Sequence, residues 1–282
     1  MIEEKNQEDH QKMLEKKSNE VEKEHNHSDI LSNVIHEGEA MFKIKNKAVF
    51  LSSTIAGLEI GFSYLLVLTL YALLGGTLEE NTVIKLFAFV YPVGFILVIL
   101  GKSVLFTEQT SLLALPVLNG QRSIFEMLRI WIFVILGNII GGILFALFIS
   151  VLGPKLHLFT TETMVAVGTH VLNYQSWVLF ASAITAGWLM GLLTWLLNST
   201  SNSLSRIVII FLITAVIGFL GLHHSIVGNI EVFGAFIYAD EISIWNYLQF
   251  LIIALLGNGV GGAIVVGLFK YRIFESNYSS KE

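Results

Sequence analysis

Six apolar stretches dominate the chain and limit what it can fold into. Each is long enough to cross a bilayer as a helix, which takes about 20 mainly apolar residues. The stretches are residues 48–75, 84–105, 127–152, 174–199, 206–222 and 245–270. Charged residues make up 14% of the chain and the mean hydropathy is +0.69, whereas about a quarter of a soluble domain is charged. The sequence therefore predicts an all-α membrane protein with six transmembrane helices.

The first 42 residues differ from the rest in composition. Residues 1–40 are rich in Glu, Lys, Asn, Gln and His, and the first aromatic residue is Phe42. This segment lacks the apolar core of a signal peptide, so we expect it to be retained as a solvated tail, disordered or loosely helical. We predict a tail over 1–42, a transmembrane domain over 43–273 and a C-terminal tail over 274–282. The absence of cysteine excludes thiol chemistry, Cys-type metal sites and disulfides.

Basic residues lie mainly on one side of the six predicted spans. Eight are on that side: Lys43, Lys45, Lys47, Arg122, Arg129, Arg206, Lys270 and Arg272. The other side has only Lys85 and Lys155, together with Glu79, Glu80, Glu162, Asp240 and Glu241. Loops rich in Lys and Arg stay in the cytoplasm. We therefore predict a multi-pass protein of the inner or plasma membrane with both termini cytoplasmic.

Two sequence features recur 120 residues apart. The segment Gly137–Gly142 (GNIIGG) reappears as Gly257–Gly262 (GNGVGG), and the polar interruption that begins at Gly101 corresponds to one that begins at Gly221. The two units have three spans each, and an odd number reverses the entry side of the second unit. We therefore predict an inverted repeat, with one half over about 43–155 and the other over about 165–273.

Each polar interruption is followed by an apolar piece too short to cross, Ser111–Leu118 and Ile226–Tyr238. The second and fifth helices are thus predicted to be broken near the bilayer midplane. In transporters with inverted repeats, such broken helices meet there and form the transport site. Non-helical backbone at that depth must be buried in protein or line a cavity, and a helix N-terminus pointing inward favours anions.

Four motifs resemble the formate/nitrite transporter family from about Phe50 to Tyr271. They are Leu105-Phe106-Thr107, Gly137-Asn138, Gly257-Asn258 and His224-Ser225-Ile226. The resemblance implies a pentameric anion channel with an aquaporin-like fold. Within the family, the chain is most similar to a branch that carries LFTE-x-T in the first break.

The resemblance also implies roles for individual residues. His224 would be the central pore histidine, and Thr107 its hydrogen-bonding neighbour on the opposing loop. Residues of the apolar constrictions would be Tyr91, Phe95 and Phe106, with Ile217 in place of a family aromatic, and Leu105 would be a further pore residue.

The chain departs from the family pattern at positions that concern selectivity rather than fold. The family has an acidic residue before Leu-Phe-Thr, an acidic residue before the central histidine, an asparagine on the fourth span and a basic residue at the start of that span. In this chain these positions hold Val104, His223, Gly187 (followed by Trp188) and Val171, and Glu108 lies just after Leu-Phe-Thr.

A histidine at the midplane can help a small anion to shed water. It can donate a hydrogen bond or a proton, so that the ion passes as its neutral acid or beside a transient imidazolium. The alternative is that His224 only ties its loop to a carbonyl. Adjacent residues on an extended segment point apart, so His223 is interpreted as making a loop hydrogen bond rather than completing a twin-histidine relay.

Three charged residues are predicted at membrane depth, Glu59, Lys102 and Glu108. Such residues usually pair with one another and are functional hypotheses by default. Lys102 could pair with Glu59 or Glu108, either to fix the broken helix or to set the electric field on the anion. Asn138, Asn258 and Ser225 are predicted to support the loop backbones, because polar side chains can satisfy the amides and carbonyls freed by a break.

The leading functional hypothesis is a channel or proton-coupled transporter for a small monovalent anion or weak acid, such as formate, nitrite, hydrosulfide, acetate or lactate. The alternative is a pore for water, glycerol or ammonia. An aquaporin would need paired Asn-Pro-Ala turns, and none exists among Pro92, Pro116 and Pro154.

Two classes of protein other than transporters are also compatible with a six-span chain. His223, His224 and Glu231 could suggest an intramembrane metal enzyme, but neither HExxH spacing nor a Cys ligand supports it. A membrane anchor whose tail recruits a partner is the other class. We therefore predict no enzymatic activity, no cofactor and no nucleic-acid partner; the expected partners are the substrate, protons, the lipid bilayer and further copies of the chain.

Overall fold

The computed structural model describes residues 27–278, and every element named in this part is a helix. Six helical segments are long and apolar enough to cross a membrane, which confirms the predicted spans. They are α3 (Asn46–Leu74), α4 (Glu80–Leu86) with η1 (Phe87–Phe89) and α5 (Pro92–Leu100), α7 (Ile124–Lys155), α9 (Ser176–Leu197), α10 (Ser203–Leu220), and α12 (Ile244–Gly259) with the π-helical η2 (Val260–Leu268) and the start of α13 (Phe269–Tyr278).

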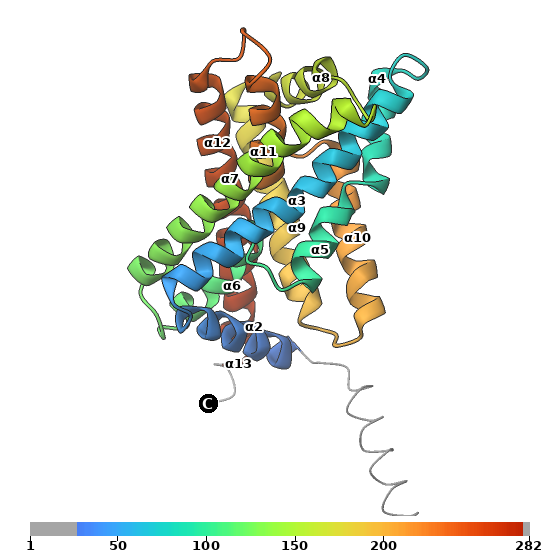
Figure 1. Cartoon of the computed structure of the whole chain (residues 1–282). Coiled ribbons are helices and arrows are strands. Elements are labelled where there is room, and N and C mark those ends of the chain that lie inside the picture. Colours follow the sequence, from blue (N-terminus) through green and yellow to red (C-terminus); the bar gives the residue numbers. More distant parts are fainter. Residues whose placement is uncertain (1–26, 279–282) are drawn as a thin grey trace, which may run out of the picture.

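The bundle has two distinct ends (Figure 1). The helices nearest the chain termini, α2 (His27–Phe42) and α13, lie at one end, which we call the terminal face. The helices α4 and α8 (Thr161–Leu172) lie at the other end, which we call the opposite face. The sequence did not predict α8, an amphipathic helix between the third and fourth spans.

The second and fifth spans are each followed by a break and a short helix. The second ends at Leu100 rather than at residue 105 as expected, because Gly101 caps it and Lys102 adopts a left-handed backbone with φ of 60°. The fifth ends at Gly221, which has φ of 62°. The short helices α6 (Phe106–Leu118) and α11 (Ser225–Phe236) have 13 and 12 residues, too few to cross a bilayer.

Glycines let the first and third spans of each half approach closely. A side chain at Gly141 of α7 would overlap the Thr54 carbonyl of α3, and one at Gly261 of η2 would overlap the Ile184 carbonyl of α9. Small residues at such crossings are the usual solution where helix backbones touch within a membrane. The two crossings use glycines 120 residues apart, as the repeat requires. The inverted orientation of the halves stays a prediction.

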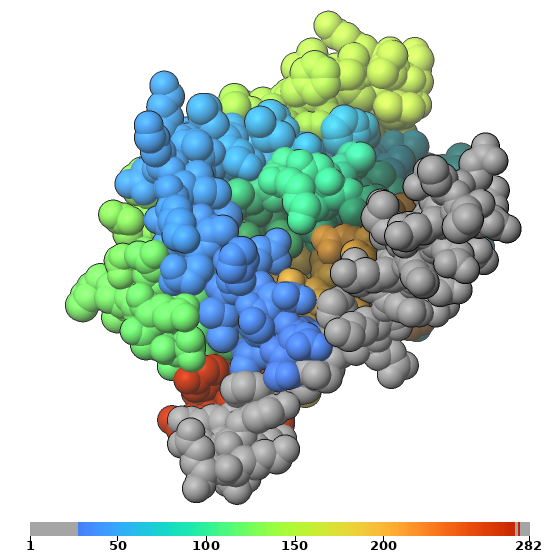
Figure 2. All heavy atoms as spheres, turned by 90° about the horizontal axis from the view of Figure 1, so that it is seen from below, coloured from blue at the N-terminus to red at the C-terminus, as the bar shows by residue number. Residues whose placement is uncertain are grey.

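The expectation of a loose tail is wrong for residues 27–42, since they form α2. This helix buries an apolar stripe of Ile30, Leu31, Val34, Met41 and Phe42. Its Gly38 packs against α6, where a side chain would overlap the Leu112 carbonyl. Figure 2 shows α2 in blue across the terminal face. Residues 1–26 and 279–282 lie outside the described part, whereas α13 extends into the predicted C-terminal tail as far as Tyr278.

Ion pairs also hold α2 in place. Arg122 donates from Nε to Glu39 Oε1 at 2.8 Å and from Nη2 to Glu39 Oε2 at 3.0 Å. The same guanidinium lies over the Phe42 ring, 5.2 Å from its centroid. At the other side of the helix, Asn198 donates to Glu37 Oε2 at 3.1 Å. The hydrogen bond from Arg122 holds the pKa of Glu39 below its usual value of 4.5.

Docking of α2 is expected to weaken in acid. A carboxylate with a lowered pKa contributes stability that is present above 4.5 and is lost as the pH falls through the lowered pKa. The protection factors of the α2 amides, which correct for the intrinsic effect of pH on exchange, should therefore fall modestly in this acidic range, as for other pairs near a surface. In Glu39→Gln the protection factors should be lowered already at neutral pH and should not change with acid in this range. An acid response equal to that of the unmodified protein would show that Glu39 is not the titrating group.

The helix crossing at Gly261 predicts a position-specific effect of one methyl group. Gly261→Ala should lower the apparent melting temperature in detergent, since overpacking typically costs about 1–3 kcal/mol. Gly259→Ala is the matched control two residues earlier, where a Cβ would meet only Trp131 at 3.8 Å. Equal melting temperatures for the two variants would contradict the close approach of η2 and α9.

Candidate pore site

The two breaks meet inside the protein through one side-chain contact. Thr107 belongs to the first turn of α6, and His224 is the residue immediately before α11. Thr107 Oγ1 lies 2.8 Å from His224 Nε2. The two residues are 117 positions apart, and their exposed fractions are 0% and 2%. The contact therefore joins the two halves of the chain at a buried point.

The surrounding hydrogen bonds determine the tautomer of His224. Its Nδ1 accepts from the backbone N–H of Val227 at 3.4 Å, as the N-cap of α11. In a neutral ring the proton then resides on Nε2, which donates to Thr107 Oγ1. Thr107 keeps its own hydroxyl proton for another acceptor. The Phe95 ring packs edge-on against the imidazole, with 5.0 Å between centroids, and limits how the ring can tilt.

Asn138 of α7 satisfies the backbone of the first break. Its Oδ1 accepts from Phe106 N at 2.9 Å, and its Nδ2 donates to the Val104 carbonyl at 2.9 Å and to the Ser53 carbonyl at 2.8 Å. The amide is fully buried, so each of these bonds replaces one to water. One side chain thus fixes the backbone on both sides of Leu105 and with it the position of Thr107.

Asn258 of α12 does the same for the second break. Its Oδ1 accepts from Ser225 N at 2.8 Å, and its Nδ2 donates to the His223 carbonyl at 3.1 Å and to the Ala183 carbonyl at 2.7 Å. The two asparagines bond to corresponding backbone groups, and the residue between the bonded groups is Leu105 in one break and His224 in the other. Ser225 supports this arrangement through its backbone N–H, since its buried Oγ has no hydrogen-bond partner.

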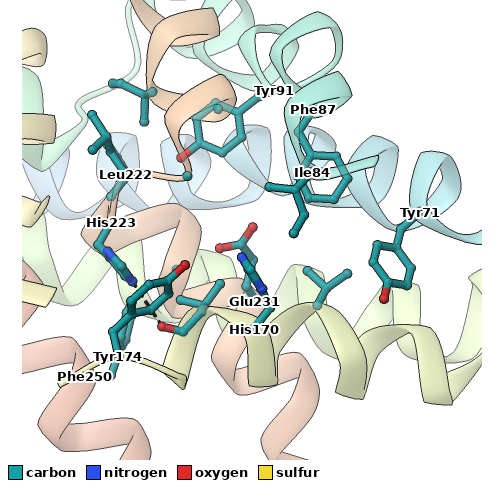
Figure 3. A pocket seen from close by; sticks show the side chains of 17 residues that line it. Tyr71, Ile84, Phe87, Tyr91, His170, Tyr174, Leu222, His223, Glu231 and Phe250 are labelled. Carbon is teal, nitrogen blue, oxygen red and sulfur yellow. Dashed lines mark hydrogen bonds between the residues drawn. The ribbon is translucent and has the colours of Figure 1, made fainter. Parts of the chain in front are cut away.

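A cavity of about 50 Å³ leads to His224 on the side of the opposite face; we call it the His224 cavity (Figure 3). A single water needs about 10–15 Å³ of such space, so several waters or a small ion fit. Its lining combines aromatic and aliphatic side chains with a few polar ones. The lining residues are Tyr71, Ile84, Phe87, Tyr91, Val167, His170, Val171, Tyr174, Ile217, Gly218, Gly221, Leu222, His223, His224, Gly228, Glu231 and Phe250.

The structure brings together some of the predicted constriction residues and separates others. Tyr91 and Ile217 line the His224 cavity, and Phe95 packs between Tyr91 and His224, edge-on to the imidazole. Leu105 is fully buried as the N-cap of α6. The Phe106 ring instead packs edge-on against Trp131 of α7, with 5.5 Å between centroids.

His223 and His224 have different surroundings. His223 Nδ1 lies 2.8 Å from Ser182 Oγ, and its Nε2 lies 3.1 Å from the Val171 carbonyl. Both ring nitrogens are therefore engaged with α9 and the end of α8. Tyr174 packs edge-on against the same ring, with 5.0 Å between centroids. His223 thus forms part of the cavity wall.

Glu59, Lys102 and Glu108 form no ion pair with one another in the described part of the chain. Lys102 Nζ lies 3.9 Å from Glu37 Oε1, in a pair whose side chains are 69% and 45% exposed. One carboxyl oxygen of Glu59, Oε2, is buried without a partner. Glu108 lies in the first turn of α6. The pairings of Lys102 that we considered are absent because the left-handed backbone at Lys102 directs it toward α2.

Glu231 was not among the predicted pore residues, although it lines the His224 cavity and is only 9% exposed. Helical spacing could have indicated it, because His224, Gly228 and Glu231 share one face of α11. From the sequence alone, Glu231 stands out only as a possible metal ligand beside His223 and His224. Among the described residues, no group of three or more His, Cys, Asp or Glu side chains could hold a metal ion.

Comparison with known proteins decides the family. The sequence profile described as formate/nitrite transporter matches residues 28–272. The chain belongs to the formate/nitrite transporter family. This is a family of membrane transporters, so the prediction that the chain is not an enzyme is confirmed.

Relatives and solved structures agree with this assignment. The chain is 28% identical to the inner membrane protein YfdC of Escherichia coli over 263 residues, covering 89% of this chain and 80% of YfdC. An FNT family ion channel superposes with a TM-score of 0.80 at 23% identity, covering 87% of this chain and 99% of that one. A pentameric formate channel with formate bound gives 0.71 at 23% identity, with coverages of 81% and 97%. The structural likenesses support the fold.

The bonds of Asn258 predict a large loss of stability on its replacement. Asn258→Leu should lower the apparent melting temperature strongly, because each buried backbone group left without a partner costs about 1–3 kcal/mol. Asn173→Leu, at the exposed end of α8, is the control and should melt close to the unmodified protein. If Asn258→Leu and Asn173→Leu had the same apparent melting temperature, Asn258 would not be holding the second break.

Proposed function

We propose that the protein is a pore for small monovalent anions or weak acids, such as formate, nitrite or hydrosulfide, with His224 and Thr107 at its centre. The observation that carries this proposal is the buried contact of 2.8 Å between their side chains, at the point where the two breaks meet. A cavity reaches His224 from the side of the opposite face. Membership of a family of formate and nitrite transporters supports the class of substrate.

The two short helices favour negative charge at this point. Both α6 and α11 begin at the Thr107–His224 contact, so both direct the positive end of their dipole toward it. An anion that has lost its water can accept from the Thr107 hydroxyl proton, and from His224 Nε2–H once it displaces the bond to Thr107 Oγ1. Such donors stabilise charge more in an apolar site than in water, and His224 can also lend a proton.

The basic residues support an orientation with the terminal face in the cytoplasm. The eight bases of the basic side lie in loops or near helix ends on one side of the six spans. The positive-inside rule assigns that side of the membrane to the cytoplasm. The His224 cavity then opens toward the outside of the inner or plasma membrane. A homopentamer is supported by the likeness to a pentameric formate channel.

A pore for neutral solutes such as ammonia, water or glycerol is the second candidate. It is favoured by the charge of the His224 cavity, whose described lining contains Glu231 and no Lys or Arg. A permanent anion gains no attraction from such a lining, whereas a neutral molecule is unaffected by it.

Uptake by proteoliposomes tests the proposal. The unmodified protein should take up members of a panel of formate, nitrite, hydrosulfide and acetate. His224→Asn should reduce that uptake by about 100-fold or more, as the loss of a positioned proton donor commonly does. His36→Asn, on the exposed side of α2, is the matched control and should be unaffected.

Thr107 provides a second test. Thr107→Val preserves shape but removes the hydroxyl group, so uptake should fall, whereas Thr107→Ser should retain most of it. Failure of the unmodified protein to move any panel member would refute the anion assignment. Vesicle swelling in glycerol or water in the same preparation would then support the neutral pore.

A further inference from the structure

Glu231 is an acidic side chain in a cavity that we propose admits anions. It belongs to the face of α11 that also carries His224 and Gly228, and it lines the same cavity as both. Only 9% of the residue is exposed, and it forms no hydrogen bond or ion pair with the described residues. A carboxyl group buried to this extent without a partner is costly unless a ligand or a proton satisfies it.

The titratable groups around Glu231 contain no strong base. On α3 they are Tyr64 and Tyr71, and the Tyr64 hydroxyl, itself buried without a partner, lies against Gly234, one turn along α11. Tyr91 follows η1, and α8 contributes His170, which is drawn beside Glu231 in Figure 3. None of these groups carries a permanent positive charge.

The remaining elements packed on α11 agree. The breaks and loops contribute His223, His224 and Tyr174, and on α12 the Tyr247 hydroxyl donates to Asn229 at 2.6 Å. Helix α7 has titratable side chains only near its ends, at Glu126, Arg129 and Lys155. A negative charge on Glu231 is therefore not balanced by a partner within the cavity.

The opposite face adds further negative charge. A surface depression beside the His224 cavity shares His170 with it and contains Glu80, Glu162 and Glu241. Such a surface attracts protons and repels anions on their way in.

We propose that Glu231 decides, by its own charge, whether an anion can enter the His224 cavity. When ionised, it repels a second negative charge in a medium where such repulsion is strong. When protonated, it has an O–H that donates a hydrogen bond to the anion, which then lies in the cavity between Glu231 and His224. Entry of an anion from the opposite face thus requires that one proton has already bound Glu231. This inference rests on the proposed function.

Formate uptake at varied external pH tests the role of Glu231, with the internal pH held constant. Above about pH 5 the concentration of the formate anion is nearly constant, whereas that of the neutral acid falls tenfold per pH unit, so uptake by protein-free vesicles is subtracted and the comparison is made between variants. Uptake by the unmodified protein should fall about tenfold for each pH unit above the pKa of Glu231. Glu231→Gln mimics the protonated form at every pH. Its uptake should vary by less than about twofold over the same range and should exceed that of the unmodified protein at the alkaline end.

Two further variants separate this role from a structural one. Glu231→Asp retains a titratable carboxyl group and should retain the pH dependence. Glu241→Gln makes the same change of charge in the exposed depression and should leave the pH profile unchanged.

Three outcomes would overturn the inference. Glu231→Gln could retain the unmodified pH profile, or it could lose uptake at every pH while still folded by size-exclusion chromatography. Either outcome would remove the role of Glu231 and leave the proposed pore intact. Absence of formate, nitrite, hydrosulfide and acetate uptake by the unmodified protein would refute both the pore and the role of Glu231.

Discussion

The structure depends on satisfying backbone groups that two breaks expose in the middle of a membrane protein. Lipid offers no hydrogen bonds, so each free N–H and C=O at that depth needs a partner from the chain. Asn138 and Asn258 provide these partners, with three hydrogen bonds each. Because each asparagine bonds to both sides of its break, the loop cannot shift relative to the helix that follows.

The functional geometry follows from this constraint. Fixing the two loops places the first turns of α6 and α11 together, and the only side-chain hydrogen bond between these turns in the described structure is Thr107–His224. The asparagines reach the breaks because α7 and α12 lie close to their neighbours, and the glycines beside them permit that approach. Packing, loop geometry and the Thr107–His224 contact are thus consequences of the same short motif, Gly-Asn followed by Gly-Gly.

Regular features of the fold could be predicted from the sequence, and local exceptions could not. The six spans and both breaks follow from apolar length and from the polar interruptions at Gly101 and Gly221, since these are determined by the membrane. Helix α2 was missed because its apolar stripe is sparse within a charged segment and is stabilised by Arg122, a distant partner. The direction of Lys102 depends on a left-handed backbone that no pattern reveals. Glu231 was overlooked because the start of α11, which defines its face, was not known.

The hydrogen bonds of the two asparagines hold the breaks without depending on the side chains beside them. Asn138 bonds to the backbone of Val104 and Phe106, and Asn258 bonds to the backbone of His223 and Ser225, so neither depends on which side chain those positions carry. Val104 and His223 are two of the positions where the sequence is expected to differ from the family pattern. Substitutions at these two positions can therefore leave the asparagine bonds, and with them the architecture, unchanged.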